Sequence, residues 1–223
     1  MASTIQVDKV QDTGGNTILS SNSTGTFTYE AASGANFTAL DADHVSAGTL
    51  AVARGGTGTT SYTAGITVAD QWRITSDLAF STAATAQLIS SNLEQIDAAW
   101  NGTIGTAMSV SSGLFTFPST GIYDVQFVIN MYRDNHMNGY CGGQIQATTN
   151  DSAYSVATFQ YQHLPDTSGV NASVFMNVLI DVTSTANVKV KFMLIGEDSG
   201  GFSARGNSSD NSTYMTFKRL GDT

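Results

Sequence analysis

Cysteine, proline and charged residues are all scarce in this chain of 223 residues. Its single cysteine, Cys141, cannot form an intrachain disulfide, so the fold cannot rest on a disulfide framework. Proline occurs only 2 times, and the 12% of charged residues is about half of the ~25% that is usual in soluble domains. Lys and Glu are common formers of surface helices, whereas the abundant Ser, Thr and Gly disfavour them. The composition therefore predicts a β-rich protein with a neutral polar surface.

Basic residues are the scarcest of the charged ones. The chain has 9 Lys and Arg against 18 Asp and Glu, which gives a net charge of −9 and a pI near 4.4. Nucleic-acid backbones are bound by clustered basic surfaces, so we expect no nucleic-acid partner. No apolar run approaches the ~18 residues of a membrane span, and residues 1–10 lack the basic and apolar order of a secretory signal. We therefore expect no membrane insertion, and synthesis and folding in a cytoplasm.

Catalytic and metal-binding motifs are also lacking. The histidines His44, His136 and His163 are far apart, and none has a partner at metal-ligand spacing. Neither Gly-x-Ser-x-Gly nor His-Glu-x-x-His occurs. The segment 196–212 is rich in Asp and Asn, whose oxygens suit Ca²⁺, but it lacks the EF-hand order and is interpreted as an exposed apical loop. We therefore expect no catalytic residue, no metal site and no cofactor.

The residues that are present divide the chain into two regions, 1–65 and 66–223. In the first, short apolar groups are separated by Gly, Asn, Ser and Thr, and they cannot offset an ordering cost of about 1–2 kcal/mol per residue. The alternation at 26–29 nevertheless indicates short strands rather than disorder. We therefore predict an extended N-terminal arm that intertwines with the arms of identical chains.

The second region carries strands at regular spacing with turn signals between them, which predicts an antiparallel sandwich. Helical spacing of apolar residues also permits a helix over 83–100, but Ser90, Ser91 and Asn92 at its centre oppose it. We interpret the whole chain as all-β. The predicted strands are 114–117, 122–131, 144–148, 154–162, 172–182, 188–195 and 214–220.

A Gly-rich segment begins near residue 48. The run Gly-Thr-Leu-Ala-Val-Ala-Arg-Gly-Gly-Thr-Gly at 48–58 resembles a motif of bacteriophage tail-fibre shafts, and residues 3–19 are similar to the openings of fibre proteins from marine phages. Gly-Gly-Thr-Gly at 55–58 could alternatively be a flexible linker or a phosphate loop. No Gly-Lys-Ser/Thr follows it, so the phosphate loop is excluded and a loop or hinge is retained.

A second resemblance concerns the region 66–223. The run Ser-Gly-Leu-Phe-Thr-Phe-Pro-Ser-Thr-Gly-Ile-Tyr-Asp-Val-Gln-Phe at 112–127 is similar to the signature of C1q/TNF-like jelly rolls, and the resemblance extends over about 70–221. It implies a jelly-roll head that assembles as a homotrimer. The final strand, 214–221, departs from that family's aromatic and Gly-rich ending, so the receptor-ligand activities of the animal proteins are not carried over.

The strand at 122–131 has two faces of different composition. Tyr123, Val125 and Phe127 share one face and are expected in the core. The other face mixes apolar and polar residues, as a subunit interface or a solvated face would, and the resemblance favours the interface. Its residues are Ile122, Asp124, Gln126 and Val128.

Receptor contact is expected from the long loop of the head, because loops on a rigid sandwich carry recognition. The residues assigned to it are Asp198, Phe202, Arg205, Asn207 and Asp210. Glycan binding would use aromatic faces, and the sequence does not choose among its candidates Tyr132, Tyr140, Tyr154, Tyr161 and Phe202.

Together these features predict a phage virion structural protein, a homotrimeric tail-fibre-like appendage assembled in the host cytoplasm. Its head would adsorb to a host-surface glycan or protein. Its arm would bind other virion proteins, through residues that we assign as Ile5, Val7, Val10, Ile18 and Leu19. Two alternatives remain: a capsid-decorating trimer pinned to the head shell by its arm, and a glycan-degrading depolymerase, which would need clustered carboxylates.

Overall fold

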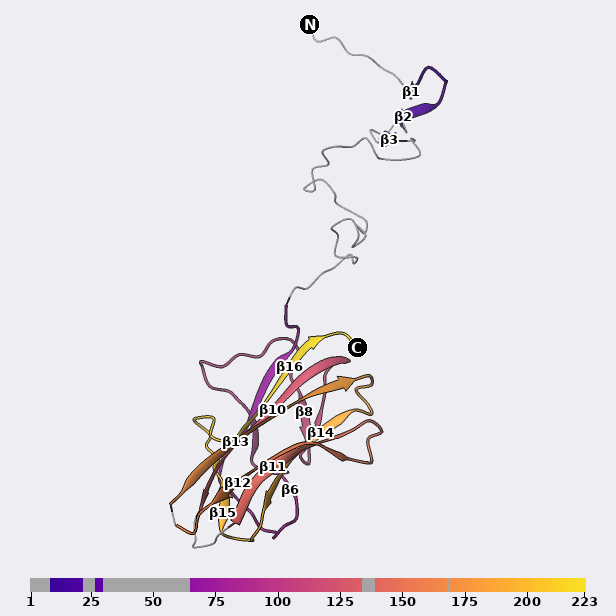
Figure 1. Ribbon diagram of the computed structural model, residues 1–223. Coiled ribbons are helices and arrows are strands. Elements are labelled where there is room, and N and C mark those ends of the chain that lie inside the picture. Colours follow the sequence, from indigo (N-terminus) through magenta and orange to yellow (C-terminus); the bar gives the residue numbers. More distant parts are fainter. Residues whose placement is uncertain (1–8, 22–26, 30–64, 134–138, 168) are drawn as a thin grey trace. The chain divides into compact units, whose positions relative to one another are not determined.

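Strands make up every regular element of the part of the chain that the structure describes. The computed structural model describes residues 9–21, 27–29, 65–133, 139–167 and 169–223, and the chain divides into two compact units, 1–62 and 63–223 (Figure 1). The all-β fold class predicted from the sequence is confirmed. Among the described residues, no helix is long and apolar enough to cross a membrane.

The first unit contains a small antiparallel sheet of order β1-β2-β3, formed by β1 (Lys9–Gln11), β2 (Thr17–Ser21) and β3 (Phe27–Tyr29). The turn between β1 and β2 is closed by Asp12, whose Oδ1 accepts the backbone N–H groups of Gly14 and Asn16 at 2.9 and 2.8 Å. Gly15 takes a positive φ of 83°, which glycine adopts without steric cost. The Asn16 side-chain hydrogen bond, followed by the backbone ones, lowers the pKa of the Asp12 carboxyl.

The second unit is a sandwich of two antiparallel sheets, called here the first and the second sheet. The first sheet has the order β5-β15-β10-β16-β4-β7, with β13 also paired to β10. Its strands are β4 (Ala69–Ile74), β5 (Leu78–Ala79), β7 (Leu93–Gln95), β10 (Gly121–Arg133), β13 (Asn171–Val182), β15 (Phe202–Ala204) and β16 (Tyr214–Gly221).

The second sheet has the order β12-β11-β14-β9-β8, with β6 also paired to β14. Its strands are β6 (Gln87–Leu88), β8 (Ser109–Ser111), β9 (Leu114–Thr116), β11 (Gly139–Thr148), β12 (Ser155–Leu164) and β14 (Lys189–Gly196). Each of the seven strands listed from the sequence corresponds to one of the longer strands or to β9. The segment 83–100 contains β6 and β7 and no helix, with Asn92 at a positive φ of 58° in the turn between them.

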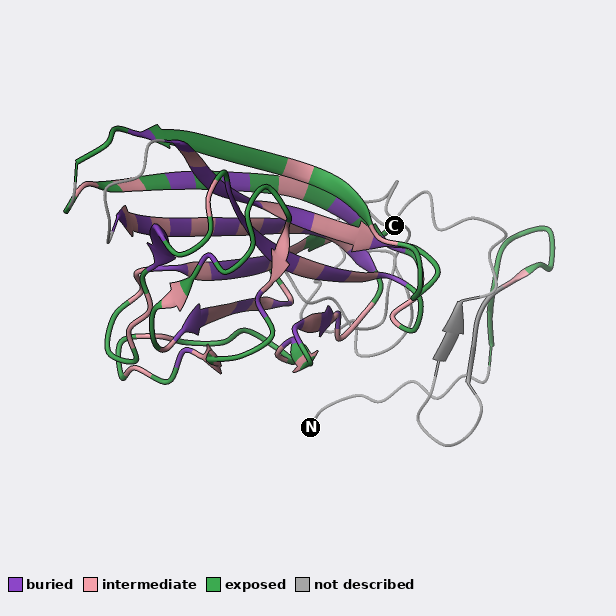
Figure 2. Ribbon diagram, turned by 90° about the horizontal axis from the view of Figure 1, so that it is seen from below, coloured by how far each residue is buried: buried purple, intermediate pink, exposed green. Residues whose placement is uncertain are grey.

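Alternation along β10 shows how the sequence forms the core. Its 13 residues alternate strictly between buried and half-buried, as Figure 2 shows for the long strands of the sandwich. Tyr123, Val125 and Phe127 are fully buried, so the core face predicted from the sequence is confirmed. Burying one face of each sheet against the other removes these apolar side chains from water, which is the dominant favourable term in folding.

Aromatic rings fill the centre of this core. Phe115 lies 5.3 Å from Phe192 in an edge-to-face arrangement and 5.2 Å from Phe217, measured between ring centroids. Edge-to-face and offset pairs of this kind add about 0.5–1.5 kcal/mol beyond the area they bury. Because Phe115 comes from the second sheet and Phe217 from the first, these rings join the two layers.

Two positions of the C1q/TNF-like run at 112–127, Gly121 and Tyr123, have a structural explanation. Gly121 has a φ of 138°, and a Cβ there would stand 2.5 Å from the Gly221 carbonyl oxygen. The buried Tyr123 hydroxyl lies 2.9 Å from Ser119 Oγ and donates to the Ser119 carbonyl at 3.1 Å, which satisfies its polar end. The glycine and the tyrosine therefore fix the entry into β10.

Candidate interface and recognition surfaces

One face of the first sheet packs on the core and the opposite face is open. Residues directly opposite each other on antiparallel strands project to the same side, so the pairing register shows which side chains share this face. Residues at alternate positions of β4, β16, β10 and β13 line it. We call this surface the open face: Gln71, Asp124, Gln126, Val128, Phe175, Asn177, Leu179, Tyr214, Thr216 and Lys218.

An apolar band crosses the open face. Val128 of β10 lies between Tyr214 of β16 and Phe175 of β13, and Leu179 lies four residues further along β13, opposite Asp124. The exposed fraction is 55% for Phe175 and 61% for Leu179, although both belong to a regular strand. Large apolar side chains left exposed on the face of a sheet are typical of an association site. The residues assigned to an interface from the sequence, Ile122, Asp124, Gln126 and Val128, are half-buried on this side of β10.

The polar residues of the open face are largely paired with one another. Asp124 Oδ2 accepts a hydrogen bond from Gln126 Nε2 at 2.6 Å and lies 3.8 Å from the Lys218 ammonium. Gln71 Nε2 donates to Thr216 Oγ1 at 2.9 Å. Asp124 Oδ1 is buried without a hydrogen-bond partner. A face whose polar groups are mostly satisfied laterally can be covered by another protein surface at a lower desolvation cost.

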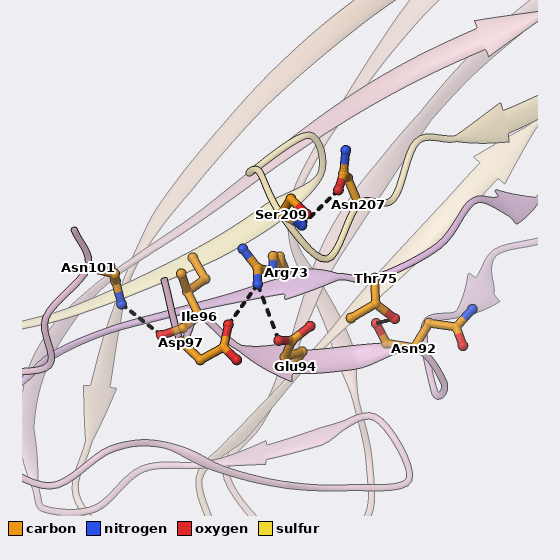
Figure 3. Close-up of polar contacts among 9 residues, drawn as sticks. All are labelled: Arg73, Thr75, Asn92, Glu94, Ile96, Asp97, Asn101, Asn207 and Ser209. Carbon is orange, nitrogen blue, oxygen red and sulfur yellow. Dashed lines mark hydrogen bonds and ion pairs between the residues drawn. The ribbon is translucent and has the colours of Figure 1, made fainter. Parts of the chain in front are cut away.

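Arg73 of β4 stands in the same row as Tyr214 and anchors a neighbouring segment (Figure 3). Its guanidinium Nη2 donates to Asp97 Oδ1 at 2.9 Å and to Glu94 Oε1 at 3.2 Å. The Arg73 side chain is 1% exposed, whereas those of Glu94 and Asp97 are 28% and 76% exposed. These two ion pairs hold β7 and the segment after it against β4. The 207–209 loop in Figure 3 also lies near β4, since the Asn207 N–H donates to the Ile74 carbonyl.

The loop 205–212 is held firmly against the sandwich. Backbone N–H groups of Arg205 and Asn207 donate to the carbonyls of Asn130 and Ile74 at 2.7 and 2.9 Å. Gly206 N–H donates to Asp77 Oδ1 at 2.9 Å, and a Cβ at this glycine would lie 2.2 Å from a backbone oxygen of the adjoining turn. These hydrogen bonds therefore hold the loop in one conformation on the surface of the sandwich.

The structure separates the residues that the sequence assigned to one receptor loop. Asp210 and Arg205 are exposed and Asn207 is half-buried, and Asn207 Nδ2 donates to Asp210 Oδ2 at 2.9 Å. Asp198 is half-buried in the preceding turn. The assignment of Phe202 to this exposed surface is wrong. Its exposure is 0%, because β15 pairs with the end of β10 and turns the ring into the core.

Three of the glycan-stacking candidates have a ring face that is occupied by a cation. The Arg205 guanidinium lies 4.4 Å from the ring centroid of Tyr132, and the Lys191 ammonium lies 4.2 Å from that of Tyr154. Such cation–π contacts use ring faces that a ligand would otherwise reach. Phe202 is likewise covered, by the Arg133 guanidinium at 4.9 Å.

The remaining two candidates come together on the second sheet. The ring centroids of Tyr140 and Tyr161 are 5.3 Å apart, and Phe159 lies 5.2 Å from Tyr161. Phe159 was not among the residues assigned from the sequence. The sequence could have indicated Phe159 as well, because it lies two residues before Tyr161 and alternate residues of a strand project from the same face.

Groups that could bind a metal do not gather in the described residues. No set of three or more His, Cys, Asp and Glu side chains among them has the arrangement of a metal site. Cys141 is fully buried, and burial raises the pKa of its thiol to about 12 despite the opposing charge of Arg133. The thiol is therefore protonated and unreactive at neutral pH.

Of the residues assigned to attachment through the arm, Ile5 and Val7 lie outside the described residues. Val10 belongs to β1 and is 43% exposed. Ile18 and Leu19 belong to β2, where the backbone alone is described. The assignment of these residues stays a prediction.

Comparison with known proteins identifies the architecture. No protein-family model and no curated protein matches the sequence. Eiger TNF of S. frugiperda matches in structure, with a TM-score of 0.51, 12% identity and coverage of 70% of this chain and 94% of that one. The head is a TNF-like jelly roll. Murine APRIL at pH 5.0 also matches, with a TM-score of 0.47, 9% identity and coverage of 69% of this chain and 98% of that one.

Proposed function

We propose that this protein is a structural component of a bacteriophage virion, a homotrimeric tail-fibre-like appendage whose head binds the host surface. The observation that supports association of the heads is the apolar band on the open face. Phe175 and Leu179 are more than half exposed on a rigid strand. A lone head would leave this band in water, whereas contact with further copies removes it and gains hydrophobic free energy.

Three copies are assigned because the sequence run at 112–127 resembles C1q/TNF-like jelly rolls, which implies a homotrimer. In a ring of three, each head presents its open face to a different surface of the next head, and the rotation closes after the third copy. The lateral pairing of Asp124 with Gln126 and Lys218 leaves few polar groups of the open face unsatisfied in that contact.

The phage assignment is supported by two stretches of sequence, residues 3–19 and 48–58, which resemble fibre proteins and fibre shafts of phages. The arm attaches the trimer to other virion proteins, and the protein assembles in the host cytoplasm. A second candidate is a trimer that decorates the capsid.

The head acts by binding and not by catalysis. A recognition role is supported by exposed side chains that are carried on rigid elements. One such element is the loop 205–212, which is held to the sandwich by the backbone N–H groups of Arg205, Gly206 and Asn207. Recognition residues on loops fixed to a sandwich keep their geometry in the unbound protein, which lowers the entropy cost of binding.

Immunogold electron microscopy of purified virions, with antibodies against residues 63–223, tests the assignment. Label at the tail supports a tail fibre, and label spread over the shell replaces it with the capsid-decorating trimer. Virions without label overturn the structural role. Incubation of the protein with host polysaccharide, followed by a reducing-end assay, tests the absence of catalysis. A time-dependent increase in reducing ends would show a depolymerase.

A further inference from the structure

Aromatic side chains project from the edge strand of the second sheet, next to a strand that is rich in glycine and glutamine. β12 pairs with β11 at the end of the strand order, and it is exposed along most of its length (Figure 2). We call Tyr140, Phe159 and Tyr161 the aromatic ledge. Phe159 is 56% exposed and Tyr161 is 38% exposed. An edge strand with large exposed aromatics is an aggregation hazard unless a ligand or partner uses it.

The backbone beneath the ledge leaves room for these rings. Gly142 of β11 lies directly opposite Tyr161, so the side chain that would otherwise share the ring's space is missing. A Cβ at Gly142 would stand 2.0 Å from the Gln160 carbonyl oxygen, so glycine is required by the close approach of the two strands. The rings of Tyr140 and Tyr161 are tilted by 44° and those of Phe159 and Tyr161 by 34°. The three rings are therefore tilted against one another in one cluster on this side of the sheet.

Side-chain amides border this surface and are connected in a chain. Gln146 Nε2 donates to Gln144 Oε1 at 2.9 Å, and Gln144 Nε2 donates to the Tyr161 hydroxyl at 3.2 Å. Gln144 lies directly opposite Phe159, so the amides and the rings share one side of the sheet. Each amide has more donor and acceptor positions than these bonds use, so both can still bind hydroxyl groups.

The ledge and its bordering amides are uncharged, and the charges around them are of both signs. The Glu197 carboxylate reaches one end, where Oε2 accepts the backbone N–H of Tyr140 at 3.3 Å. Lys191 of β14 lies directly opposite Gln146, and its ammonium is held over the ring of Tyr154. Aromatic rings and amides themselves offer no ion pair, so neutral polar groups suit this surface best.

We propose that the aromatic ledge binds neutral carbohydrate, with sugar rings stacked on Phe159 and Tyr161 and sugar hydroxyls bonded to Gln144 and Gln146. A pyranose presents a face of C–H groups to the negative face of an aromatic ring and a rim of hydroxyls to the surrounding amides. A second copy of the chain is the less favoured occupant, because hydrogen-bonding amides border the ledge, whereas the more exposed apolar side chains of Phe175 and Leu179 lie on the other sheet. This inference rests on the proposed adsorption function and names its ligand class.

The test is an array of neutral hexasaccharides of gluco, galacto and manno configuration, followed by calorimetric titration of the best binder. Phe159→Ala and Tyr161→Ala are each expected to weaken binding by about tenfold or more. Tyr161→Phe keeps the ring and is expected to retain most of the affinity. Trp100→Ala is the control, since Trp100 is 66% exposed and belongs to a segment outside the ledge. Circular dichroism verifies that each variant is folded.

Three results would overturn the inference: no hexasaccharide binds the wild-type protein, the Trp100 variant loses as much affinity as the ledge variants, or the ledge variants bind normally. Adsorption to host cells, measured by pull-down with the same variants, is a separate readout. Cells that still bind ledge variants would reject the ledge and keep the adsorption function. A wild-type protein that binds a hexasaccharide and no host cell would support the ledge and reject that function.

Discussion

Replacing the two most exposed apolar residues of the open face should break the trimer without unfolding the head. Full burial of a Phe or Leu side chain is worth about 1.5–3 kcal/mol. Since 55% of Phe175 and 61% of Leu179 is accessible in one chain, covering both is worth about 2–3 kcal/mol per subunit and about 6–9 kcal/mol per trimer. The double variant Phe175→Ser, Leu179→Ser loses this free energy.

The expected shift in assembly follows from that loss. At about 1.4 kcal/mol per factor of ten, the trimer dissociation constant rises by roughly 10⁴–10⁶. Because this constant has the dimensions of a squared concentration, the concentration at half-assembly rises about 100- to 1,000-fold. Sedimentation velocity over a dilution series measures it, by following conversion of a particle of about 70 kDa into chains of 23.4 kDa.

Phe159→Ser is the matched control, because it changes the same residue type at 56% exposure on the other sheet. It should leave the half-assembly concentration unchanged. Substitutions at exposed positions usually change the free energy of unfolding by no more than about 0.5 kcal/mol, so both variants should remain folded by circular dichroism. A wild-type protein that sediments as a single chain at all concentrations would refute the trimer. A double variant that assembles like the wild type would refute the role of the open face.

Three further predictions concern the interior. Phe115→Ala should lower the free energy of unfolding by about 3–5 kcal/mol, because the ring lies between both sheets. Urea denaturation measures this loss, and a loss of less than about 1 kcal/mol would contradict the central position of the ring. Cys141 should not react with a disulfide reagent at pH 8 until the protein is unfolded in urea. Burial raises the pKa of that thiol from 9.0 to about 12, so the thiol of the unfolded state ionises at lower pH than that of the folded state. The free energy of unfolding should therefore fall as the pH rises from 9 towards 12. Urea midpoints that do not change over that range would contradict this. Arg73→Met should lower the free energy of unfolding by less than about 2 kcal/mol, because the partly exposed Glu94 and Asp97 carboxylates can be hydrated while the methionine fills the space. Arg73→Ala should lower it further, because it leaves a cavity. Equal losses of stability in thermal denaturation would show that the packing of this side chain does not matter.

The local pattern of apolar and turn residues was sufficient to predict most of the longer strands of the head. Alternation along 122–131 predicted which residues enter the core, and the structure buries Tyr123, Val125 and Phe127 on that face. Turn residues separated the longer strands correctly, since a turn depends on a few neighbouring residues. The Gly and Tyr of the C1q/TNF-like run also act locally, through the φ of Gly121 and the bond of Tyr123 to Ser119.

Strand β4 was not recognised from such a pattern. β4 alternates little in hydrophobicity because it contains Asp70 and Arg73, both nearly inaccessible. Asp70 Oδ2 accepts the Trp72 indole N–H at 2.8 Å and the Met108 backbone N–H at 2.9 Å. Such residues are buried because partners distant in sequence satisfy them, and no local alternation records those partners.

The sequence was sufficient to predict the all-β class, the longer strands and the face of β10 that packs inward, and it excludes an intrachain disulfide. The tertiary structure alone decided that Phe202 is buried, that Phe175 and Leu179 stand exposed, and that Tyr140, Phe159 and Tyr161 meet. The physical reason is that side-chain alternation is a property of one strand. Register, edge position and the covering of a face are properties of pairs of strands, and they arise only when segments far apart in the chain hydrogen-bond and pack together.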